Sequence, residues 1–245
     1  VSSSFLKGGD FVFEGSFQQR TSSRSYSCLL SKHQEIESEM AALPRIPCQP
    51  LGIVWGDNNG SAKVVLECFI DFCCPFSKKI FDRLQEVGAK YGANLKIVYQ
   101  LVPQPWHPQS CIMAEGMIAG SLADPSRTND MAQALFNESA QFYDVNIINK
   151  SRAEMYKDLG EIAASAGIDK EKFAQKLELD TSNGQKNGGN GATRVLKLYV
   201  KQHRQLGVHV TPTIRVNGLL CDSSSSWTLE QWSEFLDPLF ANEGI

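Results

Sequence analysis

The sequence contains seven cysteines but no Cys-x-x-Cys pair. Zinc sites built from thiolates draw on such pairs, so we expect no metal site. An odd number of cysteines cannot all pair within one chain, and 245 residues can bury a core without a disulfide framework. The cysteine pattern therefore favours a mostly reducing compartment.

The sequence also has no excess of basic residues and no long hydrophobic run. The formal net charge is −3 and the isoelectric point about 5.9, which disfavours nucleic acid as a partner. No apolar run approaches the roughly 20 residues that span a bilayer, so we expect no transmembrane segment. Hydrophobic residues make up 42% of the chain, enough for one domain with an insertion or an arm.

Residues 1–47 are rich in serine and lack steady periodicity, so we interpret them as an extended N-terminal arm preceding a domain at 48–245. Residues 15–34 hold Arg20, Arg24 and Lys32 but no acidic residue. That composition resembles an organellar transit segment or its remnant and favours an organelle, the mitochondrion first. Because the first residue is Val1, we expect a processed or truncated chain.

A β-α-β pattern begins after the arm. Residues 51–55 predict a short strand, and the near-continuous apolar run 63–71 is typical of a buried central strand. Apolar residues between Ile80 and Tyr91 then recur with helical spacing, and Gly92 stands where a helix cap belongs. Residues 94–101 predict the next strand.

A long helical stretch, about 111–206, separates this unit from the C-terminal part of the chain. Strands are predicted at 213–216 and 219–221, joined by an Asn-Gly turn. Thr228 with Gln231 predicts a capping box for a final helix, as Ser151 with Glu154 does inside the helical stretch. The order of elements is that of an α/β, thioredoxin-like fold with a helical insertion.

The segment Cys74-Pro75-Phe76-Ser77 lies where the buried strand ends and a helix begins. Free backbone N–H groups and the positive end of the helix dipole stabilise a thiolate at such a place. Pro75 suits the first helical turn because it has no N–H to lose. Ser77 is on the same helical face as Cys74, so its hydroxyl could bond to the sulfur, but it cannot form a disulfide.

The second candidate segment is Val210-Thr211-Pro212-Thr213, a proline immediately before a predicted strand. The bond before Pro212 is a candidate for the cis form. In a thioredoxin-like fold this loop faces the cysteine and offers the Thr211 backbone to an extended peptide. Thr211 is therefore a candidate substrate-binding residue, and we add Pro75 and Phe76, which belong to the Cys74 motif that this loop faces.

Five stretches, FIDFCCPFS, LVPQPWHP, AQFYDV, VTPTIRVNG and WSEFLDPLF, resemble a eukaryotic family of DsbA-like, thioredoxin-fold proteins with a Cys-Pro-x-Ser site. The resemblance covers roughly residues 50–240. It implies that Cys74 is the nucleophilic thiol, that Ser77 replaces the resolving cysteine, and that Pro212 is the cis-proline. Without a second cysteine, the expected chemistry is a mixed disulfide with glutathione or a protein thiol, or disulfide isomerisation.

The residues near these two segments have structural interpretations beside the functional ones. Cys68 and Cys73 are expected to pack in the core. Asp71 either assists proton transfer near the thiol or is a solvated or capping acid at a strand end. Trp106 and His107 either line the site or pack within a proline-rich turn.

Three functions remain open. The first is a monothiol thiol-disulfide oxidoreductase or isomerase with no cofactor, whose catalytic residues are Cys74, Ser77, Thr211 and Pro212. The second is a catalytically inactive subunit of a large mitochondrial or other organellar complex, bound to its neighbours through residues 1–47. The third is an enzyme resembling the kappa-type glutathione transferases, which would place Ser77 or Cys74 against a glutathione pocket.

Overall fold

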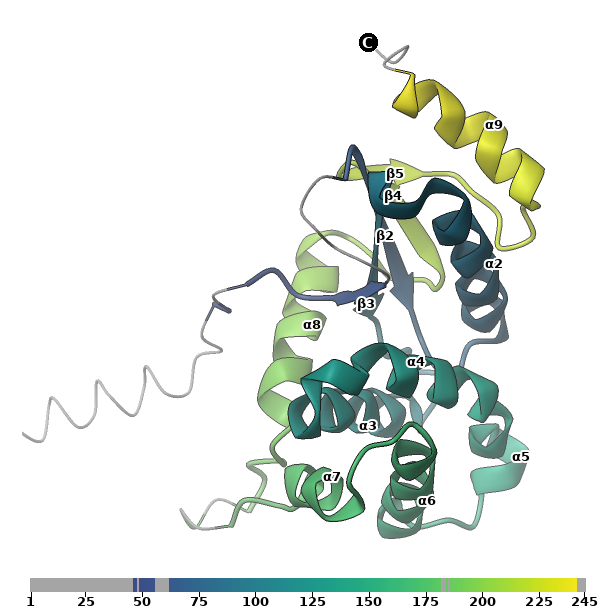
Figure 1. Ribbon diagram of the computed structural model, residues 1–245. Helices are drawn as coiled ribbons and strands as arrows, with labels where there is room; N and C mark the ends of the chain where they lie inside the picture. Colours follow the sequence, from purple (N-terminus) through teal and green to yellow (C-terminus); the bar gives the residue numbers. More distant parts are fainter. Residues whose placement is uncertain (1–45, 48, 56–61, 182–183, 185, 242–245) are drawn as a thin grey trace, which may run out of the picture. The chain divides into compact units, whose positions relative to one another are not determined.

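The computed structural model describes residues 46–241 apart from Cys48, 56–61, 182–183 and 185 (Figure 1). The chain divides into two units, Val1–Arg45 and Ile46–Ile245, and the second is described below. The predicted arm at 1–47 lies outside the described residues except for Ile46 and Pro47, and so do Cys28 and Cys48.

In the described part of the chain, five strands form one mixed sheet in the order β1-β3-β2-β4-β5. They are β1 (Ile53–Trp55), β2 (Val64–Ile70), β3 (Leu95–Leu101), β4 (Thr213–Val216) and β5 (Leu219–Cys221). Among these five described strands, the β2–β3 pair is parallel and the other three pairs are antiparallel. The apolar run of β2 thus lies at the centre of the sheet, as a strand buried on both faces requires.

Helix α2 (Pro75–Tyr91) packs its apolar face on the sheet and ends at Gly92, where φ is +53°, as the sequence predicts. The ring of Phe81 on α2 lies 4.5–5.1 Å, between centroids, from the rings of Trp55, Tyr99 and Phe136. This aromatic cluster joins the helix, two strands and the insertion into one core.

Helices and their connecting loops make up the described part of the insertion between β3 and β4, apart from one isolated bridge between Leu179 and Asn190. Its α-helices are α3 (Ser110–Ala123), α4 (Thr128–Asn137), α5 (Asp144–Ile147), α6 (Arg152–Ser165), α7 (Lys170–Leu177) and α8 (Thr193–Gln205). Figure 1 shows α3 to α7 gathered beyond one end of the sheet and α8 running alongside it, across from α2. The predicted capping box of Ser151 and Glu154 is present at the start of α6.

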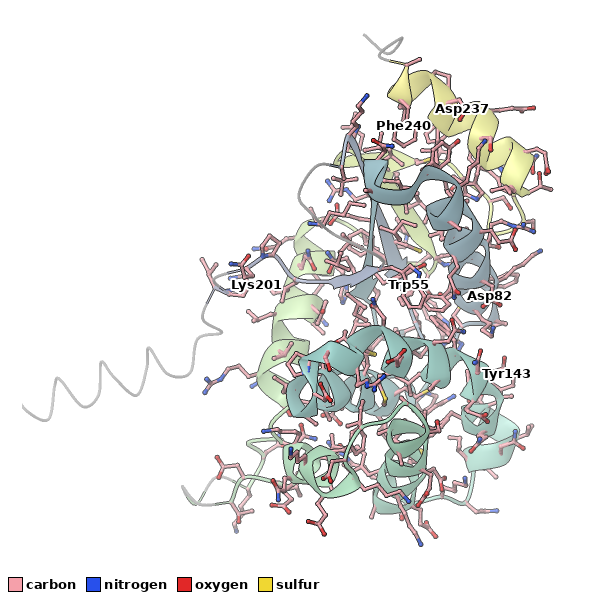
Figure 2. The ribbon with its side chains drawn as sticks, viewed as in Figure 1. Trp55, Asp82, Tyr143, Lys201, Asp237 and Phe240 are labelled. Atoms are coloured by element: carbon pink, nitrogen blue, oxygen red, sulfur yellow. The ribbon has the colours of Figure 1, made fainter. Side chains whose placement is uncertain are left out.

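Helix α9 (Leu229–Phe240) closes the described chain and packs beside α2. Its capping box of Thr228 and Gln231 is present, as predicted. The Tyr91 hydroxyl donates to Asp237 at 2.5 Å, and the Tyr91 ring stacks on Phe240; Figure 2 labels both α9 residues. Within the described ranges, no helix is both long and apolar enough to cross a membrane.

Candidate active site

Cys74 is the N-cap residue of α2, with extended backbone angles (φ −83°, ψ 119°). Its N–H donates to the Asp71 carbonyl at 3.0 Å, which closes a turn between β2 and the helix. No acidic residue occupies the first turn of α2 and Pro75 begins it, so no carboxylate offsets the positive end of the helix dipole there. The structure therefore places Cys74 at the start of a helix, directly after the buried strand, as the sequence predicts.

The loop before β4 lies against this cysteine. The peptide bond between Thr211 and Pro212 is cis, and the Cys74 thiol donates to the Thr211 carbonyl with 3.4 Å between sulfur and oxygen. Pairing of β2 with β4, in which Phe69 is opposite Thr213, brings two segments 137 residues apart together. Cys74 is only 6% exposed, because this loop covers its sulfur.

The other residues of the motif divide between core and surface. Ser77 is fully buried, and its hydroxyl accepts the Asp71 N–H at 3.2 Å. The sequence suggested the Cys74 sulfur as its partner; the structure gives the backbone of the preceding turn instead. Pro75 is exposed and Phe76 is 61% exposed, so both face the solvent beside the thiol.

Asp71 is a buried carboxylate with three hydrogen-bond donors. His107 Nδ1 donates to Oδ2 at 2.7 Å, while the Ser110 hydroxyl and the Cys73 N–H donate to Oδ1 at 2.7 and 3.0 Å. The reading of Asp71 as a solvated strand-end acid is therefore wrong, because its side chain is nearly inaccessible. His107 does more than fill a turn, since it binds the carboxylate that shapes the Cys73-Cys74 turn.

Sequence reasoning missed Ser110 and the pairing of Asp71 with His107. A signal was available: Asp71 follows β2 directly and His107 follows β3, and parallel neighbours end at the same edge of a sheet. Polar residues after two such strands are candidates for contact.

Asp71→Asn is expected to lower the free energy of unfolding by about 1–3 kcal/mol. The new side-chain amide would place an N–H₂ donor opposite one of the groups that donate to the carboxylate in the wild type. Urea unfolding at neutral pH measures the change. The matched control is Asp130→Asn, whose exposed pair with Arg127 is worth at most about 1 kcal/mol. Equal, small losses in the two variants would contradict a structural role for the Asp71 network.

The remaining described cysteines are free thiols in other surroundings. Cys73 belongs to the core, as predicted, with its sulfur 3.3 Å from that of Met113. Burial, followed by the nearby Asp71 carboxylate, raises the pKa of the Cys73 thiol far above its ordinary value. Burial alone does the same for the pKa of Cys68, which also lies in the core. Cys111 is exposed and Cys221 is half-buried.

A groove of about 310 Å³ runs from the cis-proline loop to the edge strand β5. Its lining includes Val210, Pro212, Thr213, Leu220 and Cys221. The groove therefore begins at the loop that contacts Cys74. Among the described residues, no group of three or more His, Cys, Asp or Glu side chains could hold a metal ion.

Comparison with known proteins assigns the architecture. A family model described as thioredoxin matches residues 50–238, whereas no curated protein matches the sequence significantly. A candidate protein-disulfide isomerase from Pseudomonas syringae has a TM-score of 0.61 at 22% identity, covering 76% of this chain and 97% of its own.

Two further solved structures agree. Oxidised BdbD from Bacillus subtilis has a TM-score of 0.57 at 20% identity, covering 78% of this chain and 93% of its own. The thiol-disulfide exchange protein alpha-DsbA2 from Wolbachia pipientis has a TM-score of 0.56 at 17% identity, covering 88% and 98%. The predicted DsbA-like, thioredoxin-like fold with a helical insertion is confirmed; the narrower resemblance to a eukaryotic Cys-Pro-x-Ser family stays a prediction.

Proposed function

Because the chain belongs to the thioredoxin family, we propose that it is a monothiol thiol-disulfide exchange protein in which Cys74 is the attacking thiolate. The observation that carries the proposal is the place of Cys74. It caps a helix whose first turn holds no acidic residue, and it touches the backbone of a cis-proline loop. The three solved neighbours described above are named for disulfide isomerisation or thiol-disulfide exchange, or were solved in an oxidised state.

The exchange step begins when the Cys74 thiolate attacks one sulfur of a partner disulfide. A bond forms between Cys74 Sγ and that sulfur, the partner's S–S bond breaks, and the second sulfur leaves as a thiolate that takes up a proton. Ser77 has no sulfur with which to displace the partner. The mixed disulfide therefore persists until an external thiol, from glutathione or another protein, attacks it and regenerates Cys74.

The cis-proline loop supplies the binding surface in this proposal. An extended peptide that pairs with the Thr211 backbone would take over the carbonyl that now accepts the Cys74 thiol. Exposed Phe76 and the groove beside Pro212 and Thr213 offer apolar contact to side chains on either side of the partner's cysteine. Substrate binding would thus release the sulfur and place the target disulfide against it.

The test is to incubate the reduced protein with oxidised glutathione and locate the adducts by peptide mass spectrometry. We expect a stable adduct on Cys74 in the wild type and none at position 74 in Cys74→Ser. Cys68 and Cys73 are internal controls, because their raised pKa values and burial keep them unmodified until the chain is unfolded. A Cys74 that reacts no faster than a cysteine in an unstructured peptide would overturn the proposal.

One observation favours a second candidate, a non-catalytic subunit of an organellar assembly. At 6% exposure, with its thiol donating to Thr211, the Cys74 sulfur is well covered. A subunit would co-migrate with other proteins in fixed ratio on native gels, whether or not Cys74 is replaced by serine. Migration of the native protein as a monomer would exclude this candidate.

A further inference from the structure

Basic residues are concentrated in one part of this acidic chain. Residues 181–221 contain six lysines and arginines but no aspartate or glutamate, although the whole chain carries a formal charge of −3. Arg215 forms an ion pair with Glu67. Four of the other five cations belong to helix α8.

The four cations of α8 form a stripe on one face, named here the α8 stripe: Arg194, Lys197, Lys201 and Arg204. All four are exposed, and they follow one another at intervals of three, four and three residues. With 3.6 residues per turn this spacing places them within an arc of about 80° and along roughly 15 Å of helix. Figure 2 labels Lys201 on the side of α8 that faces away from the sheet.

The opposite face of α8 holds the helix in place. Leu196 and Tyr199 are buried there, and α8 contacts β3 and α3. No large apolar side chain of α8 is exposed. The solvent-exposed face of α8 therefore carries charged side chains and no large apolar ones.

The stability of α8 does not account for the stripe. None of its four side chains forms an ion pair or hydrogen bond within the described part of the chain, unlike Lys78 with Asp82 or Lys150 with Asp158. Like charges three or four residues apart repel one another on a helix. Arg204 suits the last turn, where the dipole favours cations, but Arg194 lies in the first turn, where it does not.

We propose that the α8 stripe binds an acidic segment of a protein partner and so directs that partner's disulfide to Cys74. This inference rests on the function proposed above. The C-terminal end of α8 leads through residues 206–210 directly to Thr211 and Pro212, and Thr211 contacts the Cys74 sulfur. An acidic segment lying on α8 would therefore continue toward the cis-proline loop.

The geometry favours an acidic polypeptide over the other anionic surfaces. A helix that binds a membrane surface couples a basic face to an exposed apolar one, and the apolar face of α8 is buried in the domain. Nucleic acid would meet a chain whose overall charge repels it. A stripe about 15 Å long matches four or five extended residues, each rising about 3.3 Å.

The test compares two synthetic peptides, each with a cysteine disulfide-bonded to thionitrobenzoate and preceded by five glutamates or five glutamines. Release of the coloured thiol from the full chain gives the exchange rate. We expect the glutamate peptide to react at least about 10-fold faster at low salt, and the advantage to disappear in 0.5 M NaCl. Equal rates for the two peptides at low salt would overturn the proposal.

Paired variants separate the stripe from overall charge. Lys197→Glu with Lys201→Glu is expected to abolish the advantage of the glutamate peptide and to leave the rate for the glutamine peptide unchanged. The control, Lys157→Glu with Lys172→Glu, changes the net charge equally at exposed positions on α6 and α7 and should keep the advantage. Circular dichroism verifies that the variants remain folded. Loss of the advantage in both pairs would mean that charge alone is sensed.

Binding without chemistry distinguishes failure of this inference from failure of the proposed function. A fluorescent, cysteine-free glutamate peptide should bind Cys74→Ser and lose affinity at least about 10-fold when Lys197 and Lys201 are also reversed. If it binds while no peptide exchanges its disulfide, the surface is real and the exchange function is wrong. Tighter binding to phosphatidylserine vesicles or duplex DNA than to the peptide would reject an acidic protein partner.

Discussion

Replacement of Ser77 by cysteine is expected to shorten the lifetime of a mixed disulfide on Cys74 by a factor on the order of 100 or more. Positions 74 and 77 are the N-cap and third residues of α2, so they lie on one face of its first turn. A thiolate at 77 would attack the Cys74 sulfur, form an internal disulfide and release the partner's thiol. This intramolecular attack replaces a slow collision with an external thiol.

The measurement starts from protein carrying one glutathione on Cys74 and follows its release by intact-mass spectrometry without added thiol. Ser77→Ala is the control, because it also removes the hydroxyl that accepts the Asp71 N–H but supplies no sulfur. Its adduct should live as long as that of the wild type. If the Ser77→Cys adduct is equally long-lived, the two positions are not placed for exchange, and the motif is not a thioredoxin-type site that has lost one cysteine.

Phe81→Ala is expected to lower the free energy of unfolding by about 3–5 kcal/mol, the usual cost of emptying a phenylalanine site in a core. The ring is inaccessible to solvent and packs on Trp55, Tyr99 and Phe136. Its removal leaves a cavity between α2, the sheet and the insertion, which these rigid elements cannot close. Urea unfolding followed by far-ultraviolet circular dichroism measures the loss.

Phe76 on the same helix provides the matched control. Because it is 61% exposed beside the thiol, Phe76→Ala should change stability by no more than about 0.5 kcal/mol. If the proposed function holds, that variant should instead weaken peptide binding at the site. Comparable destabilisation by the two substitutions would show that the aromatic cluster does not organise the core.

The fold was largely predictable because its signals are local. The run 63–71 has the composition of a buried strand, and Gly92, Thr228 and Ser151 mark helix ends through backbone chemistry that acts within a few residues. The order of the strands in the sheet was not predictable in this way, because β1 pairs with the edge of β3 and no local sequence pattern encodes that pairing.

The candidate site likewise combines features that local sequence motifs predict with contacts between residues distant in sequence. Cys74 and the Thr211-Pro212 loop were identifiable from their motifs, since a thiol before a helix and a proline before a strand each have a local physical meaning. The partners of Asp71 were missed, because a carboxylate at a strand end has the same local sequence pattern whether it faces solvent or a half-buried histidine. The signal lay in the parallel pairing of β2 with β3, which brings His107 and Ser110 to the carboxylate.

The adjacent thiols Cys73 and Cys74 point to different surroundings, and this has a consequence for oxidative damage. Peroxide converts a reactive cysteine to a sulfenic acid, which a neighbouring thiol can capture as a disulfide before further oxidation. The sulfur of Cys73 packs on Met113 in the core, and position 77 holds a serine. Neither of these two positions therefore offers a thiol to a sulfenic acid on Cys74, and without capture by some other thiol it would advance irreversibly to the sulfinic state.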